Sequence, residues 1–78
     1  MQKIKVLLST GDKVNRFVAA VSKYRFPIHL STGRYRVDAK SLIGIFSLNL
    51  EKPITMEIAD DGEEGGRLIE EMKPFVAE

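Results

Sequence analysis

The chain of 78 residues is long enough for one small domain and too short for a second hydrophobic core. It contains no cysteine, which excludes disulfides and thiolate metal sites, and it has no apolar run near the roughly 20 residues of a membrane-spanning helix. The N-terminus also lacks the apolar segment of a signal peptide, so we expect a single cytoplasmic domain over residues 1–78 without membrane insertion.

The net charge of +1 conceals an uneven distribution of charge along the chain. Residues 1–40 hold nine lysines and arginines against two acidic residues, a net +7, whereas residues 41–78 hold three against nine, a net −6. A basic half suits nucleic acid, but in one small domain we expect the two halves to interleave and largely neutralise each other, so we do not favour nucleic-acid binding. Where the charges stay separated, the asymmetry suggests a basic face that could meet an acidic protein partner.

The first quarter of the chain predicts a strand followed by a helix. Residues 3–8 alternate between polar and apolar and then turn apolar, which favours a strand. Residues 9–12 form a turn in which Ser9, Thr10 and Asp12 have the short oxygen-bearing side chains that cap helices. An amphipathic helix over 13–23 follows, because four apolar residues recur at helical spacing: Val14, Phe17, Val18 and Val21.

Residues 26–37 predict a β-hairpin. Apolar residues alternate with polar ones in 26–31, and the alternation resumes in 35–37 after a turn at 31–34 that contains a glycine. The alternation predicts that Tyr35 faces the core together with Val37.

The second half predicts helix, strand and helix. Asp38 is the expected N-cap of a helix over 39–48, and residues 54–59 alternate as a strand. The last helix follows the acidic turn at 60–64 and is expected to fray or break near Pro74; its apolar stripe comprises Leu68, Ile69, Met72, Phe75 and Val76. The order βαββαβα predicts an α+β sandwich in which helices cover one face of a four-stranded antiparallel sheet.

Few residues offer catalytic chemistry. The glycines fit neither the Rossmann nor the P-loop spacing, and the acidic turn at 60–64 lacks the oxygen spacing of a calcium loop. The only histidine, His29, should point away from the core, because its neighbours Ile28 and Leu30 point into it. We therefore expect no enzymatic activity, no cofactor and no metal.

The segment 42–48, LIGIFSL, holds five large apolar residues in seven. Ile43 and Phe46 lie one helix face over from the core-facing positions, so we expect them to be exposed. Ser41 falls in the first turn of the expected helix, where an added phosphate is electrostatically favoured. From these residues alone, a plain capping role together with Asp38 is the better explanation. The residues expected to pack on the sheet are spaced three apart: Leu42, Ile45 and Leu48.

The segment Asp38–Leu48, DAKSLIGIFSL, closely resembles the regulatory-serine segment of HPr, the small phosphocarrier of the bacterial sugar phosphotransferase system. The shared pattern is Lys-Ser, two large apolar residues, Gly, two more, then Ser-Leu. The likeness extends to Ser22-Lys23-Tyr24, the turn around Gly33 and the element order. It implies the HPr fold, an open-faced β-sandwich of four strands and three helices.

The resemblance also implies a regulatory function. In HPr proteins of Gram-positive bacteria the serine matching Ser41 is phosphorylated from ATP by an HPr kinase, and the product binds a transcriptional regulator. The first two helices of HPr present an apolar surface to partner proteins, including those of the phosphotransferase system. Carried onto this chain, the docking residues are Arg16, Lys40, Ile43, Gly44, Phe46 and Ser47, with Lys13 beside them.

The chain departs from HPr at the phosphocarrier site. HPr carries its phosphoryl group on a histidine in a Gly-x-His-x-Arg-Pro motif at the start of the first helix, whereas this chain has a degenerate loop there: Ser9, Thr10, Gly11 and Asp12. Thr10 falls near the histidine's place, and Asp12, near the arginine's place, would repel a phosphoryl group. We expect a regulatory docking module without histidine phosphocarrier activity. The alternative is a phosphocarrier that uses a non-standard acceptor such as His29.

Overall fold

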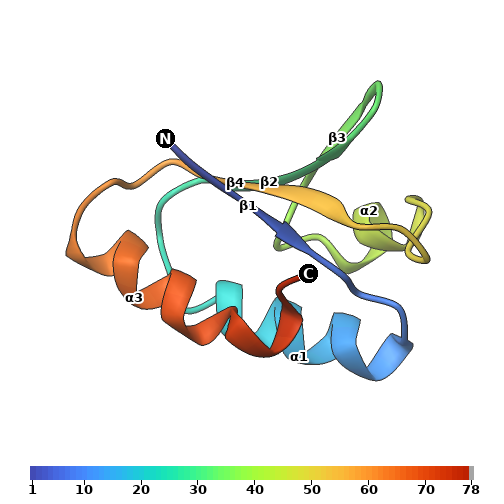
Figure 1. Ribbon diagram of the computed structural model, residues 1–78, viewed down its shortest axis with the longest axis horizontal. Helices are drawn as coiled ribbons and strands as arrows, with labels where there is room; N and C mark the ends of the chain where they lie inside the picture. The colour runs from blue at the N-terminus through green and yellow to red at the C-terminus, as the bar shows by residue number, and fades with distance from the viewer. Residues whose placement is uncertain (78) are drawn as a thin grey trace.

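The computed structural model describes residues 1–77, and Figure 1 shows the path of the chain. The observed order agrees with the predicted βαββαβα order, with a short 3-10 helix added after the last α-helix. The elements are β1 (Gln2–Val6), α1 (Gly11–Val21), β2 (Ile28–Thr32), β3 (Tyr35–Asp38), α2 (Leu42–Phe46), β4 (Ile54–Ile58), α3 (Glu63–Glu71) and η1 (Lys73–Phe75).

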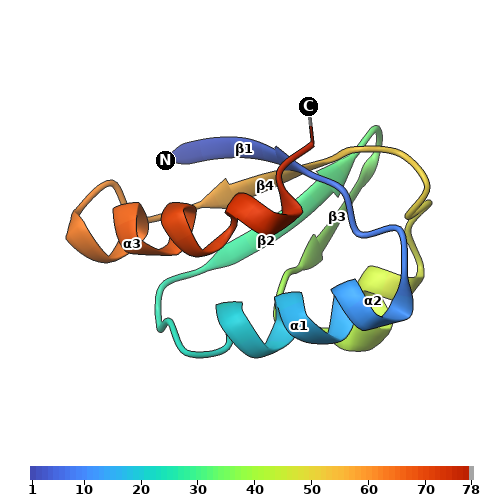
Figure 2. The ribbon, with the colours of Figure 1, turned by 60° about the horizontal axis from the view of Figure 1, so that its bottom comes forward.

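The four strands form one antiparallel sheet in the order β1-β4-β2-β3. All the helices lie on one side of this sheet, and its other face is open (Figure 2). The predicted α+β open-faced sandwich is therefore confirmed. Within residues 1–77, no helix has the length and apolar composition needed to span a membrane.

The core lies between the sheet and the helices. On α1, Val14, Phe17 and Val21 are fully buried, as their helical spacing predicted, and Val18 is partly buried. The ring of Phe17 meets that of Phe75 edge to face, with centroids 5.9 Å apart. Since Phe17 belongs to α1 and Phe75 to η1, this contact packs the C-terminal segment against the first helix.

Outside α2, two residues predicted to face the core are exposed. Tyr35 is 71% exposed, because it directly follows the Gly33–Arg34 turn, where the β2–β3 hairpin extends beyond the helices (Figure 1). Val76 is also exposed, because helical periodicity ends at η1 and Val76 is extended, pairing with Val6 at the edge of β1. The predicted break near Pro74 is confirmed.

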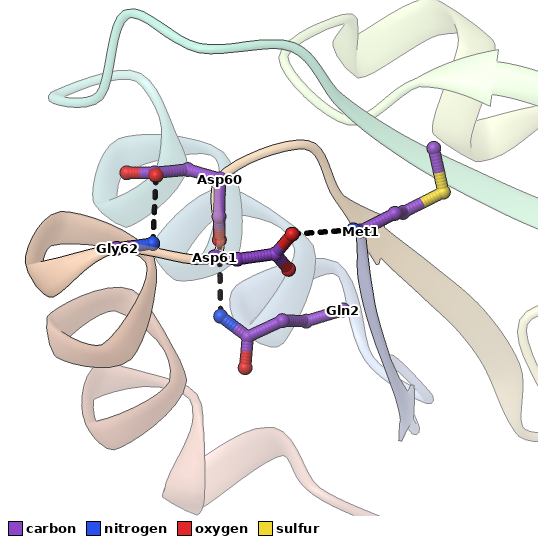
Figure 3. A network of polar contacts seen from close by, with 5 residues as sticks. All are labelled: Met1, Gln2, Asp60, Asp61 and Gly62. Atoms are coloured by element: carbon purple, nitrogen blue, oxygen red, sulfur yellow. Dashed lines mark hydrogen bonds and ion pairs between the residues drawn. The ribbon is translucent and has the colours of Figure 1, made fainter.

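The acidic turn between β4 and α3 is held by its own hydrogen bonds (Figure 3). The Asp60 carboxylate accepts from the backbone N–H groups of Gly62 at 2.9 Å and Gly65 at 3.2 Å. The Gln2 side-chain amide donates to the Asp60 carbonyl at 3.0 Å, and the Met1 amino group pairs with the Asp61 carboxylate at 2.8 Å. Asp60 therefore caps the start of α3 and ties it to β1.

Candidate functional site

Ser41, rather than the predicted Asp38, is the N-cap of α2. The Ser41 hydroxyl accepts a 3.1 Å hydrogen bond from the backbone N–H of Gly44, three residues on. Asp38 instead ends β3 and accepts from the backbone N–H of Lys40 at 2.8 Å. The prediction of a helix starting at residue 39 was wrong, because the turn after β3 delays the first helical residue to Leu42.

The apolar residues of α2 divide between core and surface. Ile45 and Leu48 are buried as predicted, and Ile43 and Phe46 are 86% and 51% exposed, also as predicted. The expectation that Leu42 packs on the sheet was wrong, since its side chain is exposed. The observed helix has only five residues and begins at Leu42, so Leu42 is its first residue and does not lie in the middle of a longer helix.

Gly44 and Ser47 make structural contacts within and around α2. A Cβ atom on Gly44 would lie 3.2 Å from the Ser41 hydroxyl oxygen and 3.3 Å from the Cβ of Val37, so the helix packs closely on β3. The Ser47 hydroxyl donates to the carbonyl of Gly44 and lies at the surface. Both residues therefore have structural contacts, and their part in docking stays a prediction.

The basic residues predicted around this surface have different environments. Arg16 is exposed on α1 and pairs with Asp12 at 3.1 Å, an exposed ion pair that contributes little to stability. The ammonium group of Lys40 instead donates to the backbone carbonyls of Tyr24 at 2.6 Å and Phe26 at 3.2 Å. Lys40 thus fastens the connection that follows α1 to the turn that precedes α2.

The loop before α1 ends in a helix cap. Thr10 is the N-cap of α1, and its hydroxyl accepts from the backbone N–H of Lys13 at 3.1 Å. Asp12 lies in the first turn, where the helix dipole favours a carboxylate. Figure 2 shows this end of α1 beside α2, and the two helices are in contact. Thr10 therefore occupies a helix N-terminus near α2, and its side chain is a hydroxyl in place of an imidazole.

His29 lies apart from this region. It is on β2, between Glu57 of β4 and Asp38 of β3 in the sheet register. Its Nδ1 is 3.3 Å from a guanidinium nitrogen of Arg36. Since the flanking residues Ile28 and Leu30 are buried, His29 faces the open side of the sheet, away from the helices.

The comparisons with known proteins agree with this arrangement. A family model described as "PTS HPr component phosphorylation site" matches residues 13–78. The chain belongs to the HPr family. The match to the HPr model begins after the Ser9–Asp12 loop, the part of the chain that departs from the family's histidine motif.

Two solved HPr structures share the fold. The crystal structure of HPr-C-His from Thermoanaerobacter tengcongensis superposes with a TM-score of 0.73 at 22% identity, covering 92% of this chain and 90% of that one. The phosphocarrier protein HPr from Bacillus anthracis strain Ames gives a TM-score of 0.71 at 21% identity, covering 97% and 94%. The comparison with curated proteins found no match.

Proposed function

We propose that this HPr-family chain is a regulatory docking module that binds protein partners through α1 and α2 and is controlled by phosphorylation of Ser41. The observation that carries the proposal is the pairing of two features on α2. Large apolar side chains are exposed on a helix whose N-cap is the serine matching the regulatory serine of HPr. In this proposal the chain does not act as a histidine phosphocarrier.

Exposure of Ile43 and Phe46 supports docking. These residues are three apart on α2, so their side chains form one apolar surface. We call Ile43, Phe46 and the neighbouring Leu42 the α2 patch. Adjacent exposed apolar side chains are typical of protein-binding surfaces, and the exposed Arg16 on neighbouring α1 favours a partner with acidic residues around an apolar contact.

The position of Ser41 supports control of this surface. Ser41 directly precedes the α2 patch, and phosphorylation would add nearly two negative charges there. The added charge would repel an acidic partner and recruit one that offers arginine side chains. The resemblance to HPr gives the chemistry, namely transfer from ATP by an HPr kinase followed by binding to a transcriptional regulator.

The environment of Thr10 supports the loss of phosphocarrier activity. Thr10 caps α1 near the place of the family's histidine, and a phosphate on its hydroxyl would be an alkyl ester without the transfer potential of a phosphohistidine. Asp12 adds a negative charge in the same turn. The only imidazole of the chain, that of His29, lies on the open face of the sheet.

Binding of an HPr kinase to α2-patch variants tests the docking part of the proposal. We expect Ile43→Ser to weaken binding by about tenfold or more, because loss of a central apolar contact at an interface typically has an effect of this size. The control is Tyr35→Ser, which also removes an exposed large side chain but lies on β3. Equal binding of both variants and the unmodified chain would contradict docking through α2.

A further inference from the structure

The open face of the sheet carries a polar depression that the proposed docking function does not use. Its volume is about 470 Å³. The side chains that line it come from β1, β2 and β4, and they include Lys3, Lys5, Ser31, Thr55 and Glu57. In the sheet register Lys3 lies beside Glu57, whereas Lys5, Thr55 and Ser31 lie side by side across three strands.

Lys3 and Lys5 place two positive charges at this depression. Glu57, beside Lys3 in the sheet register, is influenced by the charge of Lys3 but forms no ion pair with it. The two lysines are two residues apart on β1, so both side chains extend from the same face, with Cα atoms about 7 Å apart. Within residues 1–77 neither ammonium group has an acidic group within 4.0 Å or a hydrogen-bond partner. Two free ammonium groups at this spacing can converge on one dianionic group.

Glu57 is held in place rather than free to pair with these lysines. Arg36 lies 3.1 Å from one carboxylate oxygen, and the Ser31 hydroxyl donates to the other at 3.2 Å. The side chain of Glu57 is only 14% exposed. Burial opposes ionisation, but the hydrogen bonds from Ser31 and Arg36, together with the positive charges of Arg36 and Lys3, outweigh it and lower the pKa of Glu57. Glu57 is therefore a fixed, ionised acceptor that can accept hydrogen bonds from the hydroxyl groups of a ligand.

We propose that this depression binds a small phosphomonoester that carries hydroxyl groups. The dianionic phosphate would lie against Lys3 and Lys5 of β1. The hydroxyl groups would reach the Thr55 hydroxyl and the Glu57 carboxylate of the neighbouring strand. The arrangement separates a cationic part from an acceptor part, which a ligand with a phosphate at one end and hydroxyl groups at the other would satisfy.

This site is independent of the docking function. The α2 patch belongs to the helical layer, which covers one side of the sheet (Figure 2). The depression is lined by Lys3 and Lys5, which are exposed on the other face. A ligand held on β1 and β4 would leave the α2 patch uncovered. Failure of either proposal would therefore leave the other standing.

Titration of the ¹⁵N-labelled chain with glycerol 3-phosphate, followed by amide chemical shifts, tests the proposal. Parallel titrations with inorganic phosphate and with glycerol probe the two parts of the ligand separately. We expect saturable shifts confined to β1, β4 and β2, and binding of glycerol 3-phosphate at least about threefold tighter than inorganic phosphate. Glycerol alone should produce no saturable shift at these amides.

A charge-matched pair of variants makes the test specific. The double variant Lys3→Gln, Lys5→Gln should weaken glycerol 3-phosphate binding by about tenfold, and Lys52→Gln, Lys73→Gln should leave it within about twofold. The spectrum of each variant reports whether its fold is intact. Equal weakening in both double variants would show general attraction to a basic protein and would overturn the proposal. Shifts outside the open face, or no preference over inorganic phosphate, would also overturn it.

Discussion

The hydroxyl of Tyr24 donates a 2.5 Å hydrogen bond to the carboxylate of Glu71, which joins the turn after α1 to the end of α3. The ammonium group of Lys23 approaches the other oxygen of the same carboxylate at 2.9 Å. Burial, followed by the hydrogen bond to Glu71, raises the pKa of Tyr24 to about 12. Hydrogen bonds from Tyr24 and then Lys23 lower the pKa of Glu71. Glu71 thus connects the end of α3 to the residues that directly follow α1.

Replacement Tyr24→Phe should lower the free energy of unfolding by about 1–2 kcal/mol, because it removes a hydrogen bond to a charged acceptor and retains the ring. The measurement is urea unfolding at neutral pH. The control is Tyr35→Phe, which removes a hydroxyl from the exposed hairpin and should change stability by less than about 0.5 kcal/mol. Equal stability of the two variants would contradict the role assigned to the Tyr24–Glu71 contact.

The same contact predicts a dependence of stability on acid. The folded-state pKa of Glu71 lies below its unfolded value, so its contribution is present above the unfolded pKa and is lost as pH falls through the folded pKa. Stability should therefore decrease as pH is lowered from about 5 to 3, and Glu71→Gln should make this decrease shallower. Glu63→Gln, at a side chain that is 92% exposed, is the matched control. An identical pH profile for Glu71→Gln and the unmodified chain would contradict the prediction.

Gly65 and Gly66 should respond in opposite directions to replacement by alanine. A Cβ on Gly65 would lie 2.1 Å from the backbone carbonyl oxygen of Asp60, so Gly65→Ala should lower the free energy of unfolding by about 2 kcal/mol or more. A Cβ on Gly66 meets nothing within 4 Å, and Gly66→Ala should stabilise α3 by about 0.5–1 kcal/mol. Thermal unfolding distinguishes the two. Similar shifts in Tm of the same sign would contradict the close approach at Gly65.

Lys40 should behave as a structural residue. Lys40→Met keeps most of the aliphatic chain but removes the donor to the carbonyls of Tyr24 and Phe26, so stability should fall by about 1–2 kcal/mol. Lys52→Met, at an exposed position between α2 and β4, is the control and should be close to neutral. A neutral effect of Lys40→Met would contradict this structural role.

The layers of this fold could be predicted from the sequence because periodicity marks which side chains are buried. The apolar spacing on α1 placed Phe17 in the core, and the alternation in β2 placed His29 on the open face. Tyr35 continued the alternation but lies beyond the covering helices, and periodicity does not report where a layer ends.

The candidate site could be predicted in part, for a different reason. Ser41 was found because the residues around it follow a family pattern, and the exposure of Ile43 because it lies one helix face over from the core-facing positions. The sequence did not show that Ser41, and not Asp38, is the N-cap of α2. Both side chains accept hydrogen bonds from backbone N–H groups, and only the length of the turn after β3 decides which of them caps the helix. The structural contact of Lys40 was also missed, because its acceptors lie 16 and 14 residues earlier in the chain.

Intact-mass spectrometry after two parallel incubations tests the central claim most directly. One incubation contains ATP and an HPr kinase, and the other contains phosphoenolpyruvate and enzyme I. We predict one acid-stable phosphoryl group in the ATP reaction only, and its loss in the Ser41→Ala variant. An acid-labile adduct in the phosphoenolpyruvate reaction, retained by Ser41→Ala and lost in His29→Gln, would contradict the regulatory account and establish a phosphocarrier that uses the open face of the sheet.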